Sequence, residues 1–270
     1  MLARDGAPLG RFDEVDRFTD LPFPVPALIS EPMDAEEGVA VWGAAHRLRD
    51  STGLVPVLLG AEPMIDWFLG RPGPEERFGQ PCDQDVPFQG RKGRSALARI
   101  RHRPPVPAQA GPVLEVLADR LRERFSADVV DRLWSEMMTT RPVWAPRSEA
   151  LRPTSAFESD DEPVRCVLLG CPAWEVPLFL GLGGWNGSPG PVEQAVLLRG
   201  WHARHHATLL HVGRGTVDLW VERPAVRIDE VRPLLWEVLL YCCDAVFADD
   251  AAFAGVRQML ASPRWSFAWD

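Results

Sequence analysis

The chain has 270 residues, of which 46% are hydrophobic and 25% charged, and its formal net charge is -9 at pH 7. This composition is typical of a soluble globular protein with one large domain or two small ones. The negative charge repels nucleic-acid phosphate and anionic lipid. It therefore argues against nucleic acid and membrane surfaces as partners, unless a local basic patch overrides it.

Several features of the sequence predict a cytoplasmic bacterial protein. Lys92 is the only lysine among the 29 basic residues, and Ala, Pro and Gly are abundant, which suggests a high-GC bacterial genome. The N-terminus shows no apolar signal segment, and no apolar run is long enough to span a membrane. The five cysteines are odd in number. Reduced, buried thiols therefore fit better than a disulfide framework.

The first regular elements are expected between residues 34 and 60, after an extended, proline-rich lead-in over 1–33. Asp34 and Glu37 are spaced as in a capping box, which begins a helix. Apolar residues then follow at helical spacing as far as Gly53, a good left-handed stop. The apolar run 54–59 predicts a short strand that is buried on both faces.

A basic cluster lies between Arg91 and Arg103, within a stretch rich in Pro and Gly. We expect a solvated loop, and the alternative is a contact with an acidic partner. No aromatic residue interleaves these charges for base stacking, so a nucleic-acid interface has little support. Two helices are expected next, at 112–125 and 127–138. The sequence predicts an N-terminal region at 1–160, with a helical insertion at 61–160. A C-terminal α+β domain is expected at 161–270.

The C-terminal domain shows the sharpest signals. The patterns predict strands at 164–169, 174–180, 208–212, 216–222 and 265–269, a glycine turn at 181–190, and helices at 191–207 and 229–243. In the second hairpin strand, Asp218, Trp220 and Glu222 alternate with apolar residues, so one face is expected to be partly wet. We therefore predict the α+β class, with a mixed sheet of about five or six strands and packed helices.

Five segments carry a resemblance to a known family. They are TGLVPVLLG at 52–60, PAWEVPLFLGLGGWNGSP at 172–189, LLRGWHARHHATLL at 197–210, LLYCCD at 239–244 and the terminal WSFAWD. Together they resemble the domain-of-unknown-function family 4253 (DUF4253) over the C-terminal third of the chain. That family has no established activity, so the resemblance implies fold and location but no mechanism. His205 and His206 depart from it, standing where a Tyr-Gly-like pair is expected.

The glycine turn is the first candidate binding site. Gly184, Trp185 and Asn186 lie between a strand and a helix, where glycine lets the backbone approach a ligand and exposed N–H groups can hold an anion. The alternative is structural: Trp185 fills the core while Asn186 bonds its own turn. No Walker or G-x-G-x-x-G motif supports a phosphate loop.

The second candidate site is the face of the following helix. His202 points inward at helical spacing and is a candidate base, although an inward histidine is commonly a bonded core residue. Glu175 interrupts an apolar run, so it lies at an edge or in a cleft, where Arg199 or His202 would be its partner if it is buried. Arg199 is a candidate ligand-binding residue.

Metal and cofactor sites are not predicted. Cys166, Cys171, His202 and His206 nominally have the spacing of a zinc site. However, side chains five residues apart on one strand point to opposite faces, so both thiols cannot reach one ion.

The absence of a catalytic motif, the acidic charge and the 11 tryptophans favour a non-catalytic binding or accessory protein, of the immunity or regulatory kind, that binds another protein. Trp220, on the wetter face of its strand, is the candidate interface residue. The alternative is a small-molecule enzyme with a pocket between the turn at 181–189 and the helix that carries His202. Glu175 and His202 would then be its acid and base, and Asn186 would orient the substrate.

Overall fold

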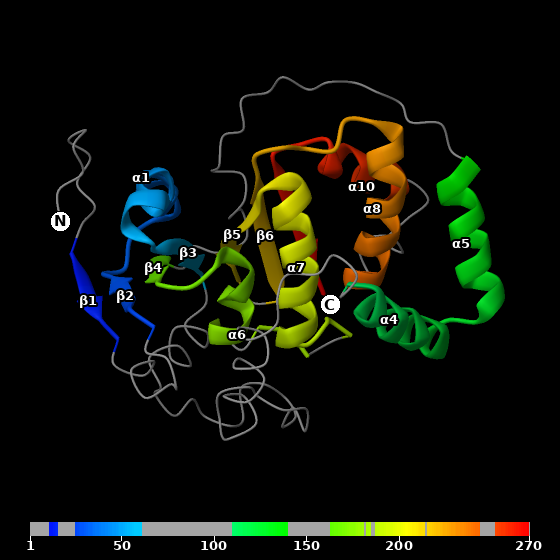
Figure 1. Cartoon of the computed structure of the whole chain (residues 1–270), viewed down its shortest axis with the longest axis horizontal. Coiled ribbons are helices and arrows are strands. Elements are labelled where there is room, and N and C mark those ends of the chain that lie inside the picture. The colour runs from blue at the N-terminus through cyan, green and yellow to red at the C-terminus, as the bar shows by residue number, and fades with distance from the viewer. Residues whose placement is uncertain are drawn as a thin grey trace.

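The computed structural model describes residues 11–15, 25–60, 110–139, 163–180, 182–184, 187–213, 215–243 and 252–269. These residues form a seven-stranded mixed sheet in the order β1-β2-β4-β3-β5-β6-β7, with helices packed around it (Figure 1). Neighbouring strands are antiparallel, except that β3 and β5 are parallel. The predicted α+β class is confirmed, with slightly more strands than expected. Within the described part of the chain, no helix is both long and apolar enough to cross a membrane.

The strands are β1 (Phe12–Glu14), β2 (Ala27–Ser30), β3 (Val55–Leu59), β4 (Arg165–Leu169), β5 (Ala207–Val212), β6 (Thr216–Val221) and β7 (Arg264–Ala268). The helices are α1 (Ala35–Thr52), α4 (Ala110–Arg124), α5 (Ala127–Thr139), the 3-10 helix η4 (Ala173–Glu175), α6 (Val176–Leu180), α7 (Pro191–His205), α8 (Ile228–Tyr241) and α10 (Ala252–Leu260). Strands β1 and β2 and helix α10 were not expected from the sequence.

Helix α1 begins and ends where its sequence predicts. The Asp34 carboxylate accepts a hydrogen bond from the backbone N–H of Glu37 at 2.8 Å. Gly53 closes the helix with φ at 69°, and its N–H donates to the carbonyl of Arg49. Each of these two hydrogen bonds satisfies a backbone group at a helix end that would otherwise have no partner within the helix. The following strand β3 is buried along its whole length, as expected.

The sheet contains strands from both sides of residue 160. Strand β4 pairs with β2 on one side and with β3 on the other, and β3 pairs in turn with β5. The helix–strand pair at 34–60 and the C-terminal segment thus contribute to one continuous hydrogen-bonded structure.

The predicted strand at 174–180 is wrong. The chain forms η4 and then α6 there, and all five residues of α6 are buried. An apolar run without alternation fits a buried helix as well as a buried strand, so periodicity could not separate the two. Pro177 lies in the first turn of α6, where its missing N–H costs no helical hydrogen bond.

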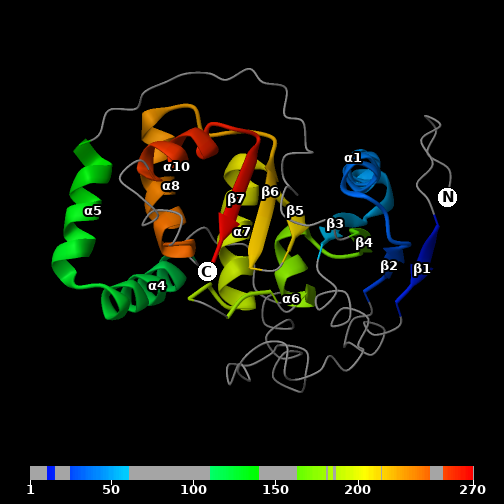
Figure 2. The same ribbon diagram turned by 180° about the vertical axis from the view of Figure 1, so that it is seen from behind.

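The sheet has two unlike faces. The face toward α7 and α8 carries the larger core, whose buried rings include Trp201, Tyr241, Trp265 and Phe267. The other face packs against α1 through a smaller cluster that includes Trp42, Leu58 and Leu168. Figure 2 shows β6 and β7 in front of α7, with α1 beside them over the neighbouring strands. The face of β6 and β7 that is turned away from α7 carries Asp218, Arg264 and Ser266, and both Arg264 and Ser266 donate to Asp218.

Candidate functional site

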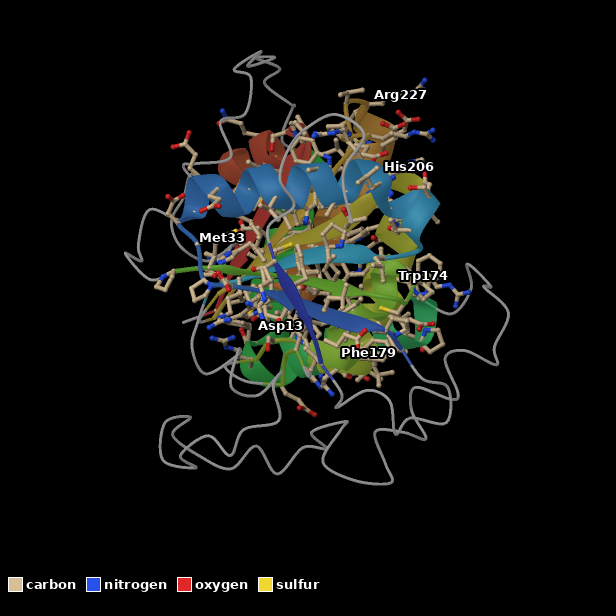
Figure 3. The ribbon with its side chains drawn as sticks, turned by 90° about the vertical axis from the view of Figure 1, so that its left-hand side faces the viewer. Asp13, Met33, Trp174, Phe179, His206 and Arg227 are labelled. Carbon is tan, nitrogen blue, oxygen red and sulfur yellow. The ribbon has the colours of Figure 1, made fainter. Side chains whose placement is uncertain are left out.

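Two of the predicted site residues meet at the last turns of α7. The guanidinium carbon of Arg199 lies 5.6 Å from the centre of the Trp174 ring, and the His202 ring lies 5.3 Å from that ring. Arg199 and His202 are three residues apart, so they are neighbours on one helix face. All three side chains are half-buried. We call Trp174, Arg199 and His202 the η4–α7 cluster; Figure 3 labels Trp174 and, farther along the same edge of the molecule, His206.

The His202 ring is held in one tautomer. Its Nδ1 lies 3.0 Å from the carbonyl oxygen of Ala207, and because a carbonyl only accepts, Nδ1 carries the proton. Burial lowers the pKa of His202, against the opposing effect of this hydrogen bond, with a further small lowering from His206. The neutral ring therefore keeps a lone pair on Nε2, which can accept a hydrogen bond or act as a base.

His206 holds a backbone conformation that usually belongs to glycine. It closes α7 with φ at 52° and ψ at 38°, which costs a non-glycine residue about 1 kcal/mol. Its ring stacks on His202 with 6.2 Å between centroids, and its Nδ1 lies 3.3 Å from Oε2 of Glu222. The side chain thus connects the η4–α7 cluster to a second group of charges.

Glu222 is the centre of that second group. Arg49 donates to Oε1 at 2.8 Å, and Nε2 of His46 lies 3.1 Å from the same oxygen. Burial raises the pKa of Glu222, but the hydrogen bonds from Arg49 and His46 outweigh it and bring the pKa to about 2. His46 stacks on Trp42 at 4.4 Å, and burial followed by the Arg49 charge lowers its pKa. This ionised carboxylate joins α1 to the end of β6.

Glu175 and Gly184 lie in surroundings that differ from those expected from the sequence. The Glu175 side chain is buried at the end of η4, next to α7, rather than on a strand. The N–H of Gly184 donates to the carbonyl of Pro189 at 3.2 Å, and Gln194 donates to the same oxygen. The described part of the turn is thus fastened to the first turn of α7.

The described part of the turn and His202 lie at opposite ends of α7. The turn precedes Pro191, and His202 lies in the last turn of the helix. At about 1.5 Å per residue, roughly 18 Å of helix axis separates Gly190 from His202. The candidate ligand residues Trp185 and Asn186 lie outside the described residues, and so does the basic segment between Arg91 and Arg103.

Sequence reasoning missed a buried charge network on the wetter sheet face. Asp218 accepts hydrogen bonds from Nδ1 of His211 at 3.1 Å, from Arg264 at 2.9 Å and from the Ser266 hydroxyl. Burial raises the pKa of Asp218, but His211, Arg264 and Ser266 together bring it below its usual value. A β-bulge between Leu209 and His211 turns the imidazole to this face. Strict alternation would have placed His211 with Leu209 on the other face.

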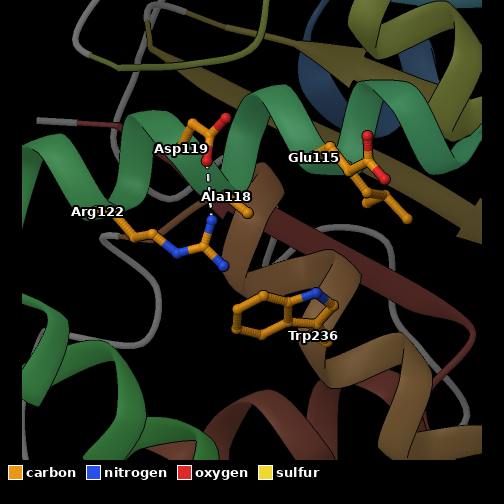
Figure 4. Close-up of a pocket in the computed structure, with 6 residues that line it drawn as sticks. Glu115, Ala118, Asp119, Arg122 and Trp236 are labelled. Atoms are coloured by element: carbon orange, nitrogen blue, oxygen red, sulfur yellow. Dashed lines mark hydrogen bonds and ion pairs between the residues drawn. The ribbon is translucent and has the colours of Figure 1, made fainter.

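A groove between α4 and α8 is the second feature that was not predicted. It has a volume of about 430 Å³ and is lined by Leu114, Glu115, Ala118, Asp119 and Arg122 of α4 and Trp236 of α8 (Figure 4). Beside it, Trp134 of α5 stands edge-on to Trp236, with ring centroids 5.0 Å apart, and is 41% exposed. The spacing of residues 115, 118, 119 and 122 places them on one helix face, which could have been recognised in the sequence.

The candidate interface residue Trp220 is half-buried on the α1 side of the sheet. Its ring meets Trp42 edge-on at 6.2 Å. The alternation that placed Trp220 there is confirmed, because Val217, Leu219 and Val221 are fully buried on the opposite face. Part of the indole surface remains open to solvent.

The cysteine thiols in the described part of the chain lie in the interior. Cys166, Cys171, Cys242 and Cys243 are buried and form no disulfide, and burial raises the pKa of Cys166 to about 12. In the described ranges, no three His, Cys, Asp or Glu side chains are arranged to hold a metal ion.

Comparison with known proteins finds a family model that matches the C-terminal part of the chain. No curated protein and no solved structure matches the chain. Strand β3 and the resemblance at 52–60 lie outside the residues that the family model matches. That model, described as Domain of unknown function (DUF4253), matches residues 170–270, which confirms that the C-terminal part of the chain is similar to this family.

Proposed function

We propose that this chain is a cytoplasmic bacterial accessory protein that binds another protein and catalyses no reaction. Its groove between α4 and α8, the α4–α8 groove, would receive a segment of the partner. The observation that carries this proposal is the exposed Trp134 ring, set edge-on against Trp236 beside the groove. An indole that is 41% exposed next to an open groove still has apolar area to bury.

The groove has the layout of a protein interface. Leu114 and Ala118 of α4 and the half-buried Trp236 supply an apolar floor. Glu115, Asp119 and Arg122 are exposed and form a polar rim. Aromatic residues at the centre and polar groups at the edge are the arrangement that recurs in protein–protein interfaces.

The charges of the rim indicate the chemistry of the partner. Asp119 is already paired with Arg122 at 2.8 Å, whereas Glu115 forms no ion pair with any described residue. The chain as a whole carries a net charge of -9. A partner segment with an apolar side chain for the floor and an adjacent Lys or Arg for Glu115 would complement the groove.

The state of three carboxylates that are paired with arginine also favours binding over acid–base chemistry. Asp218, Glu222 and Glu237 are each held by an arginine and at least one further donor. The pKa values of Asp218 and Glu222 are lowered, so both stay ionised at neutral pH. A general acid needs the opposite, a carboxyl with a raised pKa.

The test is affinity purification of the tagged full chain from its own host, followed by reconstitution with the purified partner. We would compare wild type with Trp134→Ala and Glu115→Arg. Val226→Ala is the matched control, because Val226 is an apolar residue that is 55% exposed and does not line the groove.

A single stoichiometric partner that binds wild type and Val226→Ala, and binds both groove variants at least tenfold more weakly, would support the proposal. A chain that remains monomeric and partner-free in its host would contradict it. Equal affinity of all four proteins would show that the partner binds elsewhere.

A further inference from the structure

We propose that the η4–α7 cluster is a second binding site, for a small organic acid that carries a hydrogen-bond donor beside its carboxylate. Arg199 would bind the carboxylate, and Nε2 of His202 would accept from the neighbouring hydroxyl. Trp174 would contact the apolar part of the acid. The site is independent of the α4–α8 groove.

Arg199 supplies a cation whose counter-charge is missing from the described chain. Its contact is with the Trp174 ring, and no described carboxylate pairs with it. By contrast, Arg49, Arg204 and Arg264 each pair with a carboxylate at 2.9 Å or less. A half-buried guanidinium without an anion is a binding group for carboxylate, because its planar fork matches the two carboxylate oxygens.

His202 supplies an acceptor at a fixed position. The bond from Nδ1 to Ala207 orients the ring and leaves Nε2, which has no described partner, as an acceptor. Ring contacts with Trp174 and His206 on either side further restrict the orientation. A preformed acceptor next to a preformed cation selects a ligand with both an anion and a donor.

The backbone at His206 gives a second, independent indication. Among the described residues, His206 is the non-glycine that adopts a positive φ. Glycine would adopt this conformation without strain, so a strained imidazole stacked on His202 points to a role for the side chain. That role is to hold the His202 ring in place.

The spacing limits the ligand to a small molecule. Residues three apart on a helix have Cβ atoms about 5–6 Å apart, which matches the reach of a carboxylate and an adjacent hydroxyl. Both side chains flank the same indole, at 5.6 and 5.3 Å from its ring. An aromatic hydroxy acid such as mandelate has all three features and serves as the probe.

The experiment is calorimetric titration of the full chain with mandelate and with two matched analogues of mandelate, phenylacetate and mandelamide. Phenylacetate lacks the hydroxyl, and mandelamide lacks the carboxylate. Arg199→Gln tests the cation, and His202→Phe tests the acceptor while keeping a ring on Trp174. Arg132→Gln is the control, since Arg132 is an exposed arginine on α5. Circular dichroism confirms that each variant is folded.

We expect mandelate to bind, with affinity reduced at least about tenfold in Arg199→Gln and unchanged in Arg132→Gln. Phenylacetate should bind several-fold more weakly to wild type and equally to wild type and His202→Phe. Mandelamide should not bind. Trp134→Ala should leave mandelate binding unchanged, which separates this site from the partner groove.

Absence of mandelate binding at about 10 mM would overturn the proposal, as would equal binding by Arg199→Gln. A peptide C-terminus also presents a carboxylate beside an N–H donor. Tighter binding of the tripeptide Gly-Gly-Phe than of mandelate would therefore assign the site to a protein terminus and overturn the small-acid ligand.

Discussion

The two faces of the sheet are stabilised by different means. The face toward α7 and α8 is a continuous aromatic core, in which Trp201 contacts Tyr241, Trp265 and Phe267 within 6 Å between ring centres. The face toward α1 has a smaller apolar cluster and two charge networks, centred on Asp218 and Glu222. One face depends on burial of apolar area, and the other on satisfied charges.

This difference separates the residues that stabilise the fold from the residues that are available to a ligand. The charges on the α1 face are engaged with one another, so they fix the geometry but offer little to a ligand. The groups left open lie at the periphery, at the η4–α7 cluster and the α4–α8 groove. Candidate binding residues therefore lie next to the rigid centre rather than within it.

The largest expected effect comes from the aromatic face. Trp201 is fully buried, and its indole N–H donates to Glu237 at 2.7 Å. Trp201→Ala removes the ring at the centre of the core, so the free energy of unfolding should fall by about 3–5 kcal/mol. Urea denaturation followed by circular dichroism measures this.

Trp201→Phe is the matched variant for this position. It keeps an aromatic ring but loses the donor to Glu237, so we expect a smaller loss, of about 1–2 kcal/mol. Trp134→Ala, on the exposed ring of α5, should change the stability by less than about 1 kcal/mol. If Trp201→Ala cost no more than Trp134→Ala, the aromatic face would not be the main source of stability.

The second effect tests the charge network on the opposite face. Asp218→Asn leaves the Arg264 guanidinium, only 14% exposed, without its counter-charge. We expect a loss of about 3 kcal/mol in the free energy of unfolding, measured by urea denaturation at pH 7. The double variant Asp218→Asn/Arg264→Met removes both charges and should recover part of that loss. A double variant less stable than Asp218→Asn would contradict this assignment.

The sequence predicted the parts of the fold that depend on local patterns. The capping pair Asp34 and Glu37 and the alternation around Trp220 each carry a spacing or a period that the structure confirms. The predicted strand at 174–180 was wrong because the apolar run at 176–180 shows no period that separates a strand from a helix. Strands β1 and β2 were not predicted, because three or four residues in a proline-rich lead-in give too short a pattern.

The candidate site was predicted only in part, for a related reason. Arg199 and His202 share a helix, so their proximity followed from spacing, and the structure brings both to Trp174. His46 and Arg49 lie 176 and 173 residues from their partner Glu222, and Arg264 lies 46 residues from Asp218. No local pattern encodes such contacts, and the bulge that redirects His211 has no signal in the sequence either.

The third effect measures the backbone strain at the edge between the two faces. His206→Gly and His206→Ala both remove the imidazole, so the difference between them reports the cost of a side chain at φ 52°. We expect the glycine variant to be more stable than the alanine variant by about 1 kcal/mol, because only glycine adopts this conformation freely. Paired urea denaturation curves give this difference. An alanine variant as stable as the glycine variant would mean that α7 ends without strain.

The smallest effect is the pH dependence that Glu222 contributes. Its pKa falls from 4.5 to about 2 in the folded chain, so the ionised form is stabilised by folding. This stability is fully present above pH 4.5 and is lost as the pH falls toward about 2. The shift alone corresponds to about 3 kcal/mol. Because 32% of the side chain is exposed and screened by solvent, we expect about 1 kcal/mol.

Comparison of wild type with Glu222→Gln isolates this contribution from that of the other carboxylates. Wild type should be more stable than the variant by about 1 kcal/mol at pH 7, and the two should converge near pH 2. Arg49, His46 and His206 are the basic groups that face Glu222. The difference should therefore persist down to about pH 4, until Glu222 itself takes up a proton. A difference that disappeared on acidification before the pH reached 5 would contradict the assignment to the Glu222 carboxylate.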